Sequence, residues 1–224
     1  SVAAAIDAVA FWRAYLRNDP TSRAAERHRL LCLCFLRMQD AKTNTDYATF
    51  RSDALHLIRD GDALSSLLWD RIGHWAQCDG DWAGATDAYR EAFQLEPEQY
   101  GYCLGTALNS LGRFKEALPL LIVQAERHLP DALSWFQVGV ARSGTDDRTG
   151  AIAAYRRAID LEPDYALAWF NLGGMYWNSG DIANASVVWL EAVGRFPEHD
   201  LSHRVREQYP EVFKGSGNVS AGER

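Results

Sequence analysis

Apolar residues recur every three to four positions along most of this chain, which is the spacing of one face of an α-helix. Ahead of residue 66 the pattern predicts three helices, at 2–17, 21–38 and 46–59. Pro20 separates the first two, and the polar stretch 39–46 separates the last two. Near the C-terminus, residues 200–209 have the pattern of a short polar helix with Asp200 as its N-cap. The spacing therefore predicts an all-α chain.

Within the second of these helices, residues 30–36 (LLCLCFL) are all apolar, which predicts a helix covered on several sides. An aggregation-prone strand is the alternative for this run. The basic residues ahead of it are expected to form a solvated helix face; they are Arg23, Arg27, His28 and Arg29.

From residue 66 onward the pattern repeats. Four stretches align beneath one another, at 67–97, 101–130, 133–163 and 167–197. Two kinds of small residue fix the register, each spaced by 34: Gly105, Gly139 and Gly173, and Ala117, Ala151 and Ala185. Gly73 and Ala85 begin the two series at a spacing of 32. A period of this length indicates an architecture of stacked helical hairpins.

Large side chains occupy fixed positions around these small residues. A tryptophan precedes the glycine by four residues, an aromatic residue follows the alanine by four, and a proline closes the unit. These anchors are Trp69, Trp135 and Trp169, then Tyr89, Tyr155 and Trp189, then Pro97, Pro163 and Pro197. Small residues let two helices approach closely and large ones fill the remaining gap, so we expect the anchors in the core. Gly80, Gly112 and Gly180 are expected in the turns, where φ is positive.

This pattern resembles the tetratricopeptide repeat, a 34-residue helix–turn–helix unit with the motif W-x2-L-G-x2-Y, then A-x3-F, then Pro. The resemblance covers residues 66–198 and implies four repeats, stacked as a right-handed superhelical solenoid of antiparallel helix pairs. We expect N-terminal helices over 1–65, with a cap at 2–17 and a degenerate repeat-like hairpin at 21–59. A C-terminal capping helix is expected over 199–213 and a flexible tail over 214–224.

Two units depart from the repeat pattern. The second has Gly101 in place of tryptophan and Leu121 in place of the aromatic residue, and it carries Pro119, which is expected to bend its second helix. The third has Arg142 in place of tyrosine, and Thr-Asp-Asp at 145–147 in place of the glycine turn. These changes weaken individual units and leave the register intact.

Composition limits the function classes. The 224 residues include 30 acidic and 23 basic ones, a net charge of −7 that argues against nucleic-acid binding. No apolar stretch is long enough to span a membrane. The four cysteines lack the paired spacing of a metal site, and we expect buried free thiols in a reducing compartment. A cytoplasmic protein is the expectation, and the initial Ser leaves a removed signal peptide open.

The sequence contains no HExxH, GxSxG, P-loop or GxGxxG pattern. His199 and His203 are spaced by one helical turn, but they lie in a polar segment where solvent exposure is the simpler expectation. We therefore expect a non-enzymatic chain that uses no cofactor and no metal.

In the tetratricopeptide repeat family, positions 2, 5, 9 and 12 of each first helix form the concave surface. Carried over to this chain, position 5 is Asp70, Tyr102, Phe136 and Phe170, and position 9 is His74, Thr106, Val140 and Gly174. Some members bind acidic C-termini of heat-shock chaperones through a carboxylate clamp with Lys at position 5 and Asn at position 9. Neither residue type is present at these positions, which disfavours that co-chaperone role.

The aromatic residues Tyr102, Phe136 and Phe170 are spaced by 34 and are expected to form an exposed ladder flanked by Leu133, Leu167 and Trp177. Exposed aromatic stripes in a concave surface indicate a binding site. We expect this surface to bind an apolar or amphipathic partner segment. Two alternatives are open: the aromatic residues pack between adjacent repeats, or the helix at 2–17 covers them.

Three asparagines are placed to hold polar groups of a bound segment: Asn109, Asn171 and Asn178. The expected function is a protein–protein interaction scaffold. Two rivals remain, a regulatory repeat region of a larger enzyme or secretion machine, and a structural oligomer formed by self-association.

Overall fold

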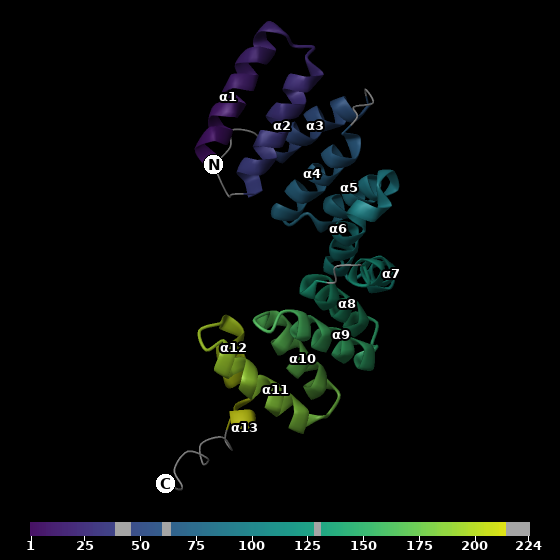
Figure 1. Cartoon of the computed structure of the whole chain (residues 1–224), viewed down its shortest axis with the longest axis vertical. Helices are drawn as coiled ribbons and strands as arrows, with labels where there is room; N and C mark the ends of the chain where they lie inside the picture. Colours follow the sequence, from purple (N-terminus) through teal and green to yellow (C-terminus); the bar gives the residue numbers. More distant parts are fainter. Residues whose placement is uncertain (39–45, 60–63, 128–130, 214–224) are drawn as a thin grey trace. The chain divides into compact units, whose positions relative to one another are not determined.

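The computed structural model describes residues 1–38, 46–59, 64–127 and 131–213, and every regular element in these ranges is an α-helix (Figure 1). The helices are α1 (Val2–Asn18), α2 (Arg23–Met38), α3 (Tyr47–Arg59), α4 (Ser65–Cys78), α5 (Trp82–Leu95), α6 (Pro97–Ser110), α7 (Phe114–Ala125), α8 (Ala132–Gly144), α9 (Arg148–Leu161), α10 (Ala166–Asn178), α11 (Ile182–Arg195), α12 (Asp200–Gln208) and α13 (Pro210–Phe213). The all-α class and the three N-terminal helices are confirmed. The predicted tail 214–224 lies outside the described residues.

The chain divides into two compact units, unit 1 from Ser1 to Leu111 and unit 2 from Gly112 onward. The first, third and fourth repeats each lie within one unit, as the hairpins α4–α5, α8–α9 and α10–α11. The second repeat divides at its turn, because α6 belongs to unit 1 and α7 to unit 2. Helix α7 continues through Pro119, and the bend expected there stays a prediction.

The turns within the hairpins combine a left-handed residue with an aspartate cap. Gly80, Gly112 and Gly180 have φ of 79°, 71° and 78°, as the sequence predicts. In the third repeat Asp146 takes this place with φ of 62°, a conformation that short polar side chains tolerate. In the first, third and fourth repeats the next residue is an aspartate that caps the second helix by accepting from a backbone N–H, at 2.9, 2.9 and 3.1 Å for Asp81, Asp147 and Asp181. The second repeat has Arg113 at this place, without a side-chain cap. The third repeat therefore keeps the same turn without a glycine.

The glycines of the first helices lie directly against aromatic rings of the second helices. A Cβ atom on Gly73, Gly139 or Gly173 would lie 2.7, 2.5 or 2.3 Å from the ring of Tyr89, Tyr155 or Trp189, respectively. All three rings are buried. The two helices of each hairpin therefore approach as closely as the repeat register predicts.

The tryptophans ahead of these glycines are less buried than expected, since Trp69, Trp135 and Trp169 are only half-buried. Trp169 donates its Nε1–H to the carbonyl of Pro163 at 2.8 Å, and the guanidinium of Arg195 lies 5.2 Å from its ring centroid. All three rings pack against the hydrophobic clusters without being fully buried, so the expected core position holds only in part.

Unit 1 has its own core, in which α1 to α5 contribute side chains. Phe50 of α3 stacks on Trp75 of α4 with ring centroids 4.5 Å apart, and Leu30 and Leu33 of α2 are buried beside them. Residues 30–36 lie within α2, so the strand alternative is wrong. Phe35 is 40% exposed, so this helix is not covered on all sides.

The basic run on α2 is only partly a solvated face. Arg29 is buried, and its guanidinium donates to the carboxylates of Glu26 and Asp53, which joins α2 to α3. His28 stacks on Trp12 of α1, with ring centroids 5.1 Å apart. The segment therefore connects three helices.

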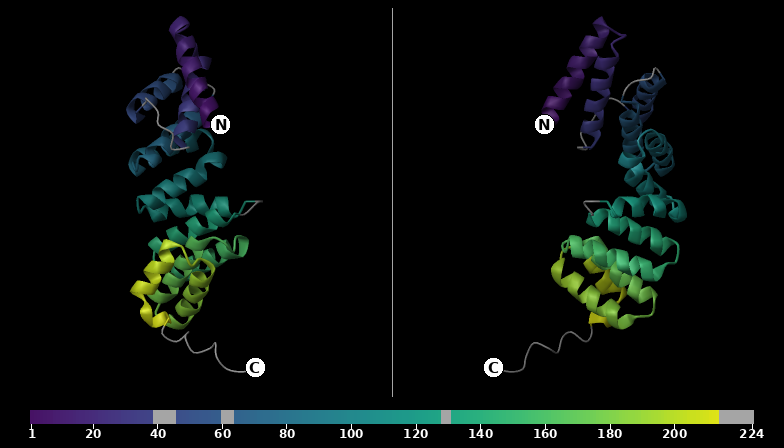
Figure 2. Two further views of the ribbon diagram at one scale, coloured as in Figure 1. Left: turned by 90° about the vertical axis from the view of Figure 1, so that its left-hand side faces the viewer. Right: turned by 45° about the vertical axis from the view of Figure 1, so that its right-hand side comes forward.

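In unit 2, helices α12 and α13 pack against the last hairpin (Figure 2). Tyr209, between them, has its ring centroid 4.5 Å from that of Trp189 and 4.6 Å from that of Trp177. The predicted helix 200–209 is confirmed within one residue, but its N-cap is His199, whose Nδ1 accepts from the N–H of Leu201 at 3.1 Å. The predicted cap, Asp200, is instead the first helical residue, where its charge favours the helix dipole.

Adjacent glycines of α10 offer a matched test of this packing. Gly173→Ala is expected to destabilise unit 2 by about 1–3 kcal/mol, because the new methyl group overlaps the buried ring of Trp189. Gly174→Ala is expected to stabilise it by up to about 1 kcal/mol, because a Cβ there meets nothing within 4 Å and alanine favours the helix. Urea unfolding of both variants measures the two values. The same sign for both would contradict the assigned packing.

Candidate functional site

All nine predicted site residues lie on first helices, but the two compact units divide them. Tyr102 and Asn109 belong to α6 in unit 1. The other seven belong to unit 2, from α8 and α10: Leu133, Phe136, Leu167, Phe170, Asn171, Trp177 and Asn178. Most of the candidate surface is therefore built by two consecutive first helices of unit 2, α8 and α10.

The expected exposed ladder is wrong for two of its aromatic residues, because Phe136 and Phe170 are only 8% and 6% exposed. The ring of Phe136 lies 5.7 Å from Tyr155 and 5.0 Å from Tyr165, centroid to centroid. Phe170 lies 5.5 Å from His199 in a stacked arrangement and 6.5 Å from Phe196.

The rings that contact Phe136 and Phe170 belong to α9 and to the segments that enter the next hairpin or the cap. Helix α1 packs against α2 inside unit 1. These contacts favour the alternative in which position 5 packs between successive repeats.

Two further residues of the predicted site are also turned toward the protein. Trp177 is half-buried, with its ring centroid 5.6 Å from that of Trp189. Asn109 is 7% exposed, so the expectation that its amide faces a partner does not hold. Tyr102 is half-buried on α6.

The remaining predicted residues form an exposed edge over the buried phenylalanines. Leu133 and Leu167, both at position 2 of their first helices, are 45% and 39% exposed. Asn171 and Asn178 are exposed on α10. Beside them, Gly174 leaves the backbone of α10 uncovered, since a Cβ there would meet nothing within 4 Å. We call these five residues the leucine edge of unit 2.

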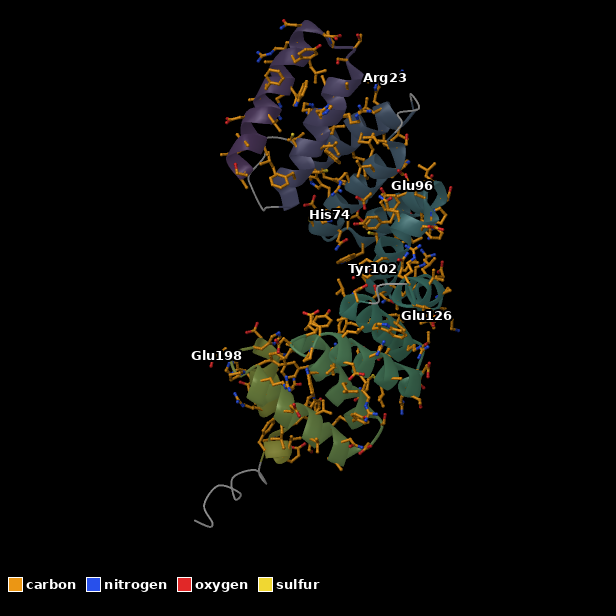
Figure 3. The ribbon with its side chains drawn as sticks, in the orientation of Figure 1. Arg23, His74, Glu96, Tyr102, Glu126 and Glu198 are labelled. Atoms are coloured by element: carbon orange, nitrogen blue, oxygen red, sulfur yellow. The ribbon has the colours of Figure 1, made fainter. Side chains whose placement is uncertain are left out.

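The first helices of unit 1 present different chemistry. His74 of α4 and Tyr102 of α6 lie on the same side of unit 1 (Figure 3). Burial raises the pKa of Asp70, which lies one helical turn before His74, and Arg71 opposes that shift with its Nε 3.5 Å from the carboxylate. Burial likewise lowers the pKa of His74, against the attraction of Asp70. Desolvation thus outweighs the attraction within this pair.

The cysteines are free thiols with unequal surroundings. Burial raises the pKa of Cys34 to about 12 and that of Cys103 to about 11, which keeps both protonated at neutral pH. Cys78 is exposed, with its Sγ 3.7 Å from Nε2 of His74, and Cys32 and Cys103 are half-buried, so the expectation of buried thiols is fully met only at Cys34. Thiols held in the protonated form are poor nucleophiles and poor metal ligands.

Within the described ranges, no three His, Cys, Asp or Glu side chains are grouped closely enough to hold a metal ion. None of the helices that the structure describes has the length and apolar character needed to cross a bilayer.

A family model described as TPR repeat matches residues 147–192, which run from the N-cap of α9 through α10 into α11. This stretch contains the glycine, the alanine and the closely packed ring of the fourth unit. Residues 147–192 thus match the tetratricopeptide repeat, and the described helices have the fold of tetratricopeptide repeat proteins. Proteins with this fold serve as protein-interaction scaffolds that bind proteins or peptides.

Curated relatives support the same repeat. Protein FlbA of Caulobacter vibrioides is 26% identical over 168 residues, which cover 72% of this chain and 27% of the relative. Tetratricopeptide repeat protein 37 of Xenopus laevis is 44% identical over 43 residues, 19% of this chain and 3% of the relative. The chain therefore spans less than a third of the length of either protein.

Solved structures share the tetratricopeptide repeat fold. YrrB, described as a TPR protein with an unusual peptide-binding site, aligns with a TM-score of 0.68 and 21% identity over 88% of this chain and 97% of its own. MamA from Desulfovibrio magneticus RS-1 aligns with a TM-score of 0.60 and 18% identity, over 87% of this chain and 98% of its own. The C-terminal part of a TPR repeat-containing protein from Cytophaga hutchinsonii aligns with a TM-score of 0.70 and 13% identity, over 93% of this chain and 80% of its own. At these identities the likeness concerns the fold.

Acid is expected to destabilise the first tetratricopeptide repeat through His74. Its pKa is held below the ordinary 6.5 in the folded state, so the unfolded chain binds more protons as the pH falls below 6.5. The free energy of unfolding therefore decreases in that window, by at most about 1.4 kcal/mol per pH unit for one proton. Urea titrations between pH 7 and pH 5 should show a shallower dependence in His74→Gln. An unchanged dependence would contradict the burial of this imidazole.

Thiol labelling should follow exposure. With a disulfide reagent at pH 8, Cys78 is expected to react first, the half-buried Cys32 and Cys103 more slowly, and the buried Cys34 only on unfolding. Spectrophotometric counting of modified thiols gives the phases, and Cys78→Ser should remove the fast one. A fast phase that survives this substitution would show that another thiol is accessible.

Proposed function

We propose that this chain is a non-catalytic interaction scaffold, and that the leucine edge of unit 2 binds an apolar or amphipathic segment of a partner protein. The observation that carries the proposal is the repeated exposure of Leu133 and Leu167 at the same position of consecutive first helices. A single exposed leucine is ordinary, but equivalent exposure on successive repeats offers a partner two matching contacts.

The buried rings beneath this edge supply rigidity. Phe136 and Phe170 fix α8 and α10 against the rest of unit 2, so little conformational entropy is lost there on binding. Covering a leucine completely contributes about 1.5–3 kcal/mol, and each of these two still has a substantial part of its surface to cover.

The polar members of the edge suit a helical or extended segment. Asn171 and Asn178 are exposed, and their amides both donate and accept. The uncovered backbone at Gly174 leaves room for a side chain of the partner. The peptide-binding site by which YrrB is described gives a precedent for peptide recognition on this fold. The free thiols are consistent with a reducing compartment such as the cytoplasm.

Substitutions on the edge should remove the partner and leave the fold intact. Affinity capture identifies a retained protein, and calorimetry with the purified partner then gives its affinity. Leu133→Asp/Leu167→Asp is expected to weaken binding at least tenfold, because two charges replace the apolar contacts. Gly174→Arg is expected to do the same by filling the open space.

The matched control is Val187→Asp, since Val187 is 63% exposed on second helix α11 and lies outside the edge. This control variant should retain the partner. The free energy of unfolding of every variant should lie within about 0.5 kcal/mol of the wild-type value, except that a residue with a higher helix propensity than glycine at position 174 adds some stability. Equal binding by the edge variants, or loss of binding in the control alone, would place the contact elsewhere.

A further inference from the structure

Unit 1 contains a cleft on a side that the leucine edge does not involve. It has a volume of about 760 Å³ and runs between second helix α5 and α3, with α4 beneath them. This volume falls within the range of sites that bind small molecules or short peptide segments. None of the nine residues of the predicted site lines it.

The cleft exists because the facing positions of α3 and α5 are small. Helix α3 presents Ala48 and Ser52, and helix α5 presents Gly84 and Ala88. In the repeat hairpins, large rings such as Tyr155 and Trp189 fill the space between helices. Where Ala48 and Ser52 face Gly84 and Ala88, the small side chains leave a trough, and the rings of Tyr47 and Trp69 line it.

The floor of the cleft is apolar and partly aromatic. Leu55, Ile72 and Ala88 form its base, and the half-buried rings of Trp69 and Tyr47 line it. Aromatic faces next to an apolar base suit a side chain that is apolar along its length and cationic at its tip.

The rim carries more carboxylates than guanidinium groups: Asp81, Asp87 and Glu91 against Arg51 and Arg90. Arg90 already pairs with Asp87, its Nη1 lying 3.4 Å from Oδ1. Two carboxylates then face a single remaining guanidinium, that of Arg51. Burial raises the pKa of Tyr47, Arg51 opposes that shift, and Asp81 adds to it, so both signs of charge lie near this ring. An acidic segment would be repelled here, and a basic one attracted.

We propose that this cleft docks a peptide segment of a partner protein that carries an apolar side chain next to a lysine or arginine. The apolar side chain covers Leu55 and Ile72, and the cation lies between the aromatic rings and the carboxylates of Asp81 and Glu91. The scaffold thus has two recognition surfaces of different chemistry, an uncharged edge in unit 2 and an acidic cleft in unit 1. The second surface stands independently of the first, because none of its residues is shared.

Two labelled synthetic peptides with the same leucine positions test this assignment, one with lysine and one with glutamate at every other position. Fluorescence anisotropy with the full chain is expected to show binding of the lysine peptide, weakened by added salt, and at least tenfold weaker binding of the glutamate peptide. Asp87→Arg/Glu91→Arg should weaken the lysine peptide about tenfold, because the attraction of Glu91 becomes repulsion and Arg90 loses the carboxylate that neutralises it. Ser52→Trp should weaken the binding of the lysine peptide through both its charges and its leucines, because the new ring fills the trough.

Each variant has a matched control in the same unit. Asp7→Arg makes one such charge reversal on the exposed side of α1, which is half the charge change of the double variant, and Ala83→Trp adds the same ring on α5 outside the cleft. Both controls should bind the lysine peptide within twofold of wild type, as should Leu167→Asp. Circular dichroism melts establish that each variant is folded. Equal loss in Asp7→Arg would show a net-charge effect, and loss in Leu167→Asp would place the peptide on the leucine edge; either result overturns the proposal.

Discussion

The fit between a glycine on one helix and an aromatic ring on the next sets the geometry of the hairpins. With a Cβ at Gly73, Gly139 or Gly173, the rings of Tyr89, Tyr155 and Trp189 could not lie where they do. The two backbones approach so closely that the side chains around them have a single well-packed arrangement. Aspartate caps and left-handed turn residues hold the same helices at their other end. Partners can contact only the residues that this packing leaves exposed.

That packing decides which apolar residues of the first helices remain exposed. Phe136 and Phe170 occupy the position that the sequence suggests for a binding ladder, yet Tyr165 and His199 of the following segments cover them. The leucines one turn earlier stay uncovered. A partner would therefore contact leucines and not aromatic rings on this surface. Aliphatic side chains select their partners less by shape and orientation than aromatic rings do.

Sequence periodicity was sufficient for the helices, the hairpin register and the close glycine contacts, because all of these are local and repeat with a fixed spacing. Burial was harder to predict where it depends on residues outside the repeat pattern. The ring partners Tyr165 and His199 occupy loops whose course no spacing rule gives. The half-burial of Trp169 depends on a loop carbonyl and on Arg195. The α3–α5 cleft could not be predicted for a similar reason, since a trough arises from the mutual placement of small residues on two helices that are distant in sequence.

The division of the chain within its second repeat has a consequence for the lifetime of the molecule in a cell. Each unit has its own hydrophobic cluster, built from residues that are close in sequence. Loss of one cluster does not require loss of the other, so a molecule with one unit open and one folded is an accessible state. Proteases act on such partly open states, at a rate that follows the less stable unit rather than the sum of both. The turnover of the scaffold is thereby set by its weaker half.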